Sequence, residues 1–387
     1  MNPSLSRREL IKAAAGFSAA AVCSSTGLSY AKSTPQPKVI IVLFGGGTRS
    51  SETIDDPSHK YIPNLWNKMV PKGTLFSNMR VEGKVVHPNS AGSVVTGHWE
   101  WEDIDWSKPV KNPTIYEIYR KARRENDTSA WAFVYASILT KTGYSLDKNY
   151  GPKYGANVVV PPTISRAAKE QIDQLMQKAA ASGTKESEIA AARKCASIAK
   201  QKSQIDFADL RSTAARQFMQ KQYDKWKSSN GSTSHDAFIA DCAIASMKKF
   251  APSVISVDFG EIDCAHYGSW SRYVDAIART DELTFKLWQT TQQLKEYRDN
   301  TLMLILPDHG RQADHPDDPA HFGFIHHSDF YTGKGIDESC RRVWMLAIGK
   351  GVNKAKVQIP TPITSVAATA LSHLSLSASP NAEKSAL

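Results

Sequence analysis

The sequence has 387 residues, of which 41% are hydrophobic and 22% are charged, so it can bury a large core as one domain or as a domain with an insertion. Its formal net charge of +10 favours anionic ligands, although a basic solvated surface explains the charge equally well. No zinc-finger spacing and no aromatic-interleaved RNA-binding pattern accompanies the basic residues, so we expect no nucleic-acid partner.

The first 31 residues resemble a twin-arginine export signal. The pair Arg7-Arg8 precedes the apolar run Ala13–Val22, and small residues end the segment at Ala31. Because the apolar run is too short to span a bilayer, we expect no stable membrane anchor. The interpretation predicts export by the twin-arginine translocase, a mature domain over residues 32–387, and a periplasmic or secreted location.

Four cysteines follow that segment, at positions 195, 242, 264 and 340. No C-x-x-C pair occurs among them, so neither a zinc ribbon nor a redox motif is indicated. Disulfides are permitted in an exported protein, but their pairing cannot be assigned from the sequence.

The first part of the mature chain predicts an α/β fold. A continuous apolar run, Lys38–Phe44, predicts the first central strand, and further strands are expected at 73–78 and 129–135. Between them, the apolar spacing of 113–119 predicts a helix capped by Thr114. The alternation of strands and helices indicates a mostly parallel central sheet flanked by helices.

Residues 165–247 differ from the rest of the chain. They contain long Ala, Lys, Gln and Glu stretches with apolar residues at helical spacing. We expect a helical insertion on the sheet here. Strand patterns return at 253–257, 302–306 and 342–349, with helices predicted at 270–297 and 360–374.

Three glycines, Gly45-Gly46-Gly47, follow the first predicted strand. They allow close approach of the backbone to an anion, and they are equally compatible with a plain sharp turn. A G-x-G-x-x-G fingerprint is absent, which disfavours a nicotinamide or flavin cofactor.

Acidic and imidazole side chains follow the later strands. Asp263 and His266 come after the strand at 253–257, Asp308 and His309 follow the strand at 302–306, and the pair His326-His327 lies in the next loop. Open α/β sheets keep their ligands at the carboxyl ends of the strands. Divalent metals that act on phosphoryl or sulfuryl groups need carboxylates and imidazoles that converge from several strand ends. A single loop histidine is usually structural, but three such groupings predict a metal site.

This order of features is similar to that of the alkaline phosphatase superfamily, which includes phosphodiesterases, sulfatases and cofactor-independent phosphoglycerate mutases. The resemblance implies that Asp263, His266 and a later histidine bind one metal, with His327 fitting better than His326. It implies that the Asp-His-Gly step, with Asp308 and His309, supplies two ligands of a second metal. We expect one or two divalent ions, zinc first, with manganese, magnesium or calcium as alternatives.

The first half of the chain departs from this pattern in two places. Family members carry a metal-binding Asp at the tip of the first strand, where this chain has glycines, and Glu52, Asp55 and Asp56 are out of register. The family nucleophile, a Thr, a Ser or a modified Cys, lies nine residues before a Thr-Gly step, and that register holds His87.

Ser90 lies in an Asn-Ser-Ala setting that resembles alkaline phosphatases, and it is the predicted nucleophile. Ser93 and His87 are the alternatives. A helix cap formed by Asn89 and Ser90 explains the same residues equally well.

The resemblance implies an exported metal-dependent hydrolase of phosphate monoesters, phosphodiesters or related small anionic esters. Ser90 would attack phosphorus, while Arg311 and Arg49 would neutralise the equatorial oxygens. A non-catalytic metal-binding periplasmic protein that keeps the fold is the alternative. A sulfatase is a further alternative, although the Cys/Ser-x-Pro-x-Arg maturation motif is absent.

Overall fold

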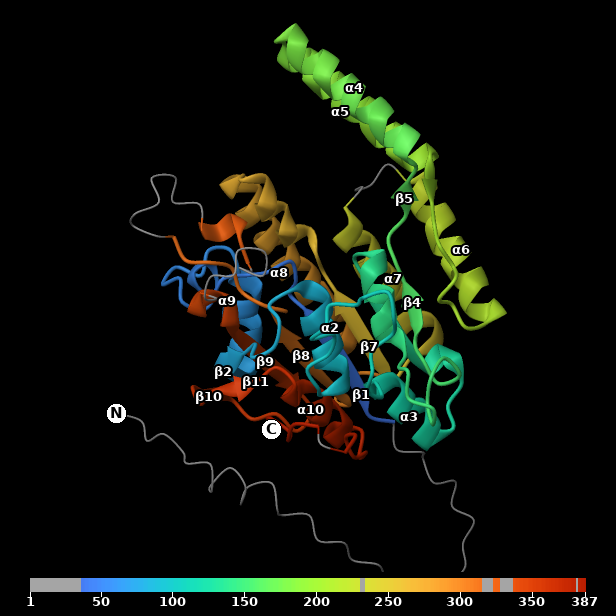
Figure 1. Ribbon diagram of the computed structural model, residues 1–387, viewed down its shortest axis with the longest axis vertical. Coiled ribbons are helices and arrows are strands. Elements are labelled where there is room, and N and C mark those ends of the chain that lie inside the picture. The colour runs from blue at the N-terminus through green and yellow to red at the C-terminus, as the bar shows by residue number, and fades with distance from the viewer. Residues whose placement is uncertain (1–35, 230–233, 315–322, 328–336, 381) are drawn as a thin grey trace, which may run out of the picture. The chain divides into compact units, whose positions relative to one another are not determined.

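The computed structural model describes residues 36–229, 234–314, 323–327, 337–380 and 382–387 (Figure 1). The predicted export signal, residues 1–31, lies outside these ranges. In the described part of the chain, no helix has the length and apolar character needed to cross a bilayer. Cys195, Cys242 and Cys264 are free cysteines in the described part of the chain.

A nine-stranded sheet forms the centre of the domain, in the order β10-β2-β9-β8-β1-β7-β3-β4, with β11 paired to β2. β1 (Lys38–Leu43) lies between β8 (Thr301–Leu306) and β7 (Val254–Asp258) and is parallel to both. The remaining strands are β2 (Gly73–Arg80), β3 (Ala130–Val134), β4 (Asn157–Val159), β9 (Arg342–Gly349), β10 (Ala355–Val357) and β11 (Thr361–Pro362). Only the pairs that β9 makes with β2 and β8 are antiparallel within this sheet. The predicted mostly parallel α/β sheet is therefore confirmed.

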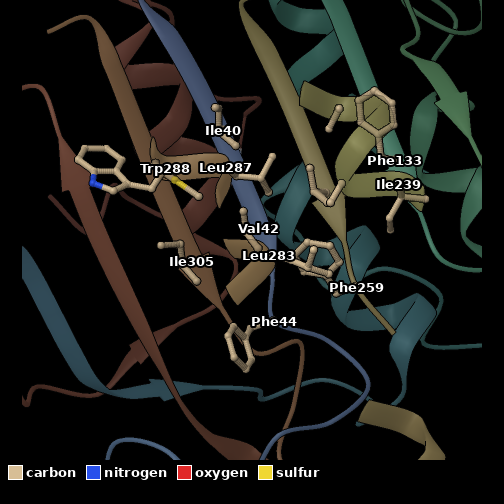
Figure 2. Packing of buried hydrophobic residues seen from close by; sticks show 14 of the residues in the cluster. Ile40, Val42, Phe44, Phe133, Ile239, Phe259, Leu283, Leu287, Trp288 and Ile305 are labelled. Carbon is tan, nitrogen blue, oxygen red and sulfur yellow. The ribbon is translucent and has the colours of Figure 1, made fainter. Parts of the chain in front are cut away.

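Side chains of β1 alternate between two hydrophobic clusters, as the strand geometry requires. Ile40, Val42 and Phe44 face the cluster that contains Leu283 and Leu287 of α8 (Trp270–Gln293), as Figure 2 shows. The alternate residues of the strand face the other cluster, which includes residues of α2 (His87–Thr96), α3 (Ile115–Arg123) and α10 (Ser365–His373). Because both faces are covered, β1 is apolar at every position after its first residue.

The helical block of residues 165–247 has two parts. α4 (Arg166–Ser182) and α5 (Lys185–Gln201) pack on each other, and the short strands β5 (Thr163–Ile164) and β6 (Ser203–Gln204) pair at their bases. α6 (Thr213–Ser228) follows. The last helix, α7 (His235–Phe250), instead packs on β3 and β7, and its residue Ile239 is fully buried in the sheet core (Figure 2). The block 165–247 thus contains two helices with few buried residues, α4 and α5, and two helices, α6 and α7, that contribute to the core cluster of the sheet.

Short helical segments complete the fold. They are Ser50–Glu52, Leu65–Met69, Val70–Lys72, Asp127–Ser129, Ser137–Gly143, Glu261–Tyr267, Gly323–Ile325 and α9 (Glu338–Arg341). At α3, Thr114 accepts a hydrogen bond from the backbone N–H of Glu117, and the Glu117 carboxylate accepts one from the backbone N–H of Thr114. This reciprocal capping box confirms the predicted Thr114 cap.

Candidate metal centre

Several segments bring acidic and imidazole side chains to the carboxyl edge of the sheet. Because β1, β7 and β8 are parallel neighbours, the residues that follow them lie side by side. Asp308 comes shortly after β8, and the helical segment Glu261–Tyr267, which holds Asp263 and His266, comes shortly after β7. The start of α2 adds His87 to the same edge.

The glycine loop after β1 contributes backbone and no side chain. Gly46 and Gly47 have φ values of 93° and 74°, which residues with a Cβ rarely adopt. A Cβ at Gly46 would lie 2.5 Å from the backbone N of Asp263, and one at Gly47 would lie 2.8 Å from Cε1 of His309. The loop therefore packs too closely for a carboxylate side chain to replace the family's first-strand Asp.

The three acids that could have replaced that Asp all have other partners. Glu52 pairs with Arg49 at 2.7 Å, Asp55 pairs with Arg342 at 2.6 Å, and Asp56 accepts hydrogen bonds from Ser58. Arg49 is held further by Gln312 O at 2.9 Å and by Asp314 at 3.0 Å. This arginine, which was expected to contact the substrate, is therefore engaged within the protein.

His309 and His327 are both arranged to offer Nε2 as an acceptor. Nδ1 of His309 lies 2.8 Å from the carbonyl of Gly310, and Nδ1 of His327 lies 3.4 Å from the carbonyl of Val85, so in each ring Nδ1 carries the proton. Burial lowers the pKa of His309 to about 4, although Asp308 acts in the opposite direction. Burial also lowers the pKa of His327 far below its usual range. Both rings are therefore neutral, as metal-binding imidazoles must be.

His87 and Asp308 form a close buried pair. Nδ1 of His87 lies 2.5 Å from Oδ2 of Asp308, whose Oδ1 accepts a 3.1 Å hydrogen bond from the N–H of Gly47. Burial acts to raise the pKa of Asp308, but His309 and His87 outweigh it and lower the pKa to about 2. Burial acts to lower the pKa of His87, but Asp308 and Asp263 outweigh it and raise the pKa to about 10. In the metal-free protein, His87 is thus a cation paired with Asp308.

Asp263 is the second acid of the cluster. Its Oδ1 lies 3.0 Å from Nε2 of His266 and 3.2 Å from Nε2 of His87. Burial acts to raise its pKa, but the hydrogen bonds from His266 and His87 and the charge of Arg311 hold the pKa well below its usual range. Asp263 is therefore ionised and available as a ligand.

Two groups in this cluster could hold a metal ion. One is Asp263, His266 and His327, and the other is His87, His309 and His327, with the ligand atoms of each group within 4.8 Å of one another. A set of imidazoles and carboxylates suits zinc, whereas manganese, magnesium and calcium favour oxygen ligands. Because an imidazole nitrogen has one lone pair, and Nδ1 of His327 faces a carbonyl, His327 can serve one ion only.

Arg311 is fully buried, and its guanidinium has no N–H left for a substrate. It donates to Oδ1 of Asp263 at 2.7 Å, to the carbonyls of Gly46 and Gly47, and at 3.4 Å to the carbonyls of Phe324 and Ile325. These five acceptors match the five N–H groups of a guanidinium. In this structure the Arg311 side chain joins the glycine loop, Asp263 and the 323–327 segment, and its contact with equatorial oxygens stays a prediction.

The remaining predicted residues form no hydrogen bond with the cluster among the described residues. Ser90 lies inside α2 with 1% of its surface exposed, and among the described residues its hydroxyl has no hydrogen-bond partner. Ser93 accepts a 3.1 Å hydrogen bond from the backbone N–H of Glu100. His326 is exposed, whereas its neighbour His327 joins both candidate metal groups. Of the three nucleophile candidates, His87 contacts the acidic residues of the cluster, and the roles of Ser90 and Ser93 stay predictions.

Asp258 was not singled out from the sequence. It is the last residue of β7, and a Cβ at Gly45 would lie 3.1 Å from its Oδ1. Burial and the charge of Asp308 raise its pKa well above the usual range. Its place directly after the buried run Val254–Val257 was the signal that could have identified it.

No family model matches this sequence, and no curated protein matches it. Solved structures of similar fold include an alkaline phosphatase, PafA, in a mutant form, at 10% identity, covering 92% of this chain and 99% of that chain with a TM-score of 0.53. The phosphonate monoester hydrolase SpPMH from Silicibacter pomeroyi is 11% identical, with 91% and 76% coverage and a TM-score of 0.53. The sulfatase PsFucS1 from Pseudoalteromonas sp. is 12% identical, with 88% and 68% coverage and a TM-score of 0.50. The chain therefore has the alkaline phosphatase-like fold that the sequence resemblance implied.

Proposed function

We propose that this protein is an exported metal-dependent hydrolase of phosphate monoesters, phosphodiesters or related small anionic esters. The observation that carries the proposal is the cluster of neutral imidazoles and ionised carboxylates at the carboxyl edge of the sheet. The names of the three similar structures, a phosphatase, a phosphonate monoester hydrolase and a sulfatase, support a substrate of this class.

In this proposal Asp263, His266 and His327 hold one ion, and Asp308 and His309 belong to a second site. Zinc is the proposed metal, since imidazole nitrogen and carboxylate oxygen are its common ligands. A bound divalent ion would polarise the ester and stabilise the charge that develops on its oxygens.

The protein's own residues prepare this site before a substrate arrives. Carbonyl groups hold the Nδ1–H of His309 and His327, so both rings are oriented with Nε2 toward the cluster. Arg311 fixes one oxygen of Asp263 and ties it to the glycine loop. We therefore propose that Arg311 is a positioning residue, whose absence would displace Asp263.

Ser90 stays the predicted nucleophile from sequence, and its buried position requires that α2 shift before its hydroxyl can reach a substrate. Ser90→Ala tests this directly. Loss of turnover with unchanged metal content would support a nucleophilic Ser90, whereas unchanged turnover would remove it from the reaction.

The test of the proposed function is turnover of aryl phosphate monoesters, aryl phosphodiesters and aryl sulfates by the purified, metal-analysed mature protein. We expect turnover of a phosphate ester, and we expect Asp308→Asn to lower it at least about 100-fold, in line with the loss of a metal ligand or its supporting shell. Asp241→Asn is the matched control, because this acid is 67% exposed and pairs with Lys286 at the surface. Turnover of the sulfate alone would instead support the sulfatase alternative.

The non-catalytic alternative has support of its own. The glycine loop supplies no carboxylate, and the serine expected to attack is buried. A protein that binds metal and turns over none of the three ester classes would establish this alternative and exclude the hydrolase.

A further inference from the structure

His87 lies where it touches both residues of the second site. Its Nδ1 is 2.5 Å from Oδ2 of Asp308 and 3.0 Å from Nε2 of His309. Oδ2 of Asp308 and Nε2 of His309 are themselves 3.4 Å apart. Three potential ligand atoms from two distant segments, α2 and the loop after β8, thus form a small triangle.

The size of this triangle fits one ion. A tetrahedral zinc with bonds of about 2.0–2.1 Å separates its ligand atoms by about 3.3 Å. The two distances from Nδ1 of His87, 2.5 and 3.0 Å, are shorter than this value, and the distance of 3.4 Å between Asp308 and His309 is close to it. Nδ1 of His87 must therefore move away from Asp308 for the three atoms to surround a metal.

Each of the three side chains is also oriented by a second partner. The other oxygen of Asp308 accepts from the N–H of Gly47, and Nδ1 of His309 faces the carbonyl of Gly310. The remaining nitrogen of His87, Nε2, lies 3.2 Å from Oδ1 of Asp263. Metal-binding histidines commonly donate their second N–H to a carboxylate or a carbonyl in this way.

The glycine loop explains why a ligand is needed from α2. No side chain fits at Gly46 or Gly47, so the loop after β1 cannot provide a carboxylate to this site. His327 cannot complete it while it serves Asp263 and His266, because its one free lone pair is then occupied.

We propose that His87, Asp308 and His309 bind a divalent transition metal ion, with Nδ1 of His87 in the ligand position that the glycine loop cannot fill. The inference deepens the proposed function, since it concerns the second site of the same centre. With Nδ1 on the metal and the Nε2–H donated to Asp263, His87 has no nitrogen free to attack an ester. The residue in the nucleophile register is then a ligand and forms no covalent intermediate.

The experiment is zinc titration of the metal-free mature protein against a chromophoric chelator, with no substrate present. We expect two ions for the wild type and one for His87→Ala, whose second ion binds at least about 100-fold more weakly. His266→Ala should lose the other ion and retain the one held by His87. His98→Ala is the matched control, because this histidine pairs with Ser379 outside the cluster, and it should retain both ions.

A variant of similar size guards against misfolding. His87→Gln keeps most of the side-chain volume, and its urea-unfolding midpoint in chelator shows whether it is folded. The proposal is overturned if either His87 variant binds two ions with wild-type affinity. It is also overturned if the wild type binds only one ion and both variants still bind that ion. A protein that binds two ions and hydrolyses no ester would refute the proposed function while leaving this inference standing.

Discussion

Replacement of Arg311 by methionine should destabilise the protein severely. The guanidinium is fully buried and pairs with Asp263 at 2.7 Å, while four backbone carbonyls accept its other N–H groups. Removing one partner of a buried ion pair typically costs about 3–5 kcal/mol. The Asp263 side chain is 31% exposed and keeps its contacts with His266 and His87, whereas the carbonyls of the glycine loop lose their donors, so we expect a loss at the lower end of this range.

The assay is urea unfolding of the metal-free protein in excess chelator, because bound metal would stabilise the folded state by mass action. Arg166→Met is the control. Arg166 also pairs with an acid, Glu170 at 2.9 Å, but its side chain is 94% exposed. Exposed helical pairs of this spacing contribute about 0.3–0.5 kcal/mol, so the control should stay close to the wild type.

The two roles considered for Arg311 give different results. If Arg311 holds Asp263 and the glycine loop together, Arg311→Met lowers the free energy of unfolding and the metal affinity together. If the free energy of unfolding stays within about 1 kcal/mol of the wild type while turnover is lost, the structural reasoning is refuted. The sequence-based role of charge neutralisation would then be correct.

Two further predictions concern the glycine loop and the first strand. Gly47→Ala should cost about 1–2 kcal/mol for its left-handed backbone and also weaken metal binding, because its Cβ would lie 2.8 Å from Cε1 of His309. Gly183→Ala has a similar φ of 64° with open space around its Cβ, so it should lose stability and keep metal affinity; equal metal binding by both variants would contradict the packing argument. Burial lowers the pKa of Lys38 to about 8, so between that pH and about 10 the unfolded chain binds more protons and the free energy of unfolding should rise with pH. Urea unfolding at several pH values should show that the free energy of unfolding of Lys38→Met lacks this rise. If the variant shows the same dependence on pH as the wild type, the role of Lys38 is refuted.

Local patterns were sufficient for the central strands. β1 and β8 are buried on both faces, so each appears in the sequence as an apolar run after its first residue, and β7 is interrupted only by Ser256 before it ends at Asp258. The capping box of α3 is equally local, because its two partners lie three residues apart. The predicted helix at 360–374 begins later, at Ser365, because the residues before it form β11 against β2.

The placement of α7 could not be read from its pattern. Its apolar residues follow helical spacing, which a core helix and an inserted helix share. α7 packs on β3 and β7, and these contacts place it in the core. β7 follows α7 closely in the chain, whereas β3 lies far before it, so the contact with β3 cannot be read from the local pattern.

The sequence by itself determined the sheet, the strand ends that carry Asp263 and Asp308, and the resemblance to the alkaline phosphatase fold, since each depends on short segments. Tertiary structure alone decided what His87 and Arg311 touch. His87 meets Asp308 across 221 residues of chain, and Arg311 meets Gly46 across 265. Such contacts depend on how separate elements pack. A local pattern of polarity or spacing therefore does not predict which distant group a buried polar side chain will contact.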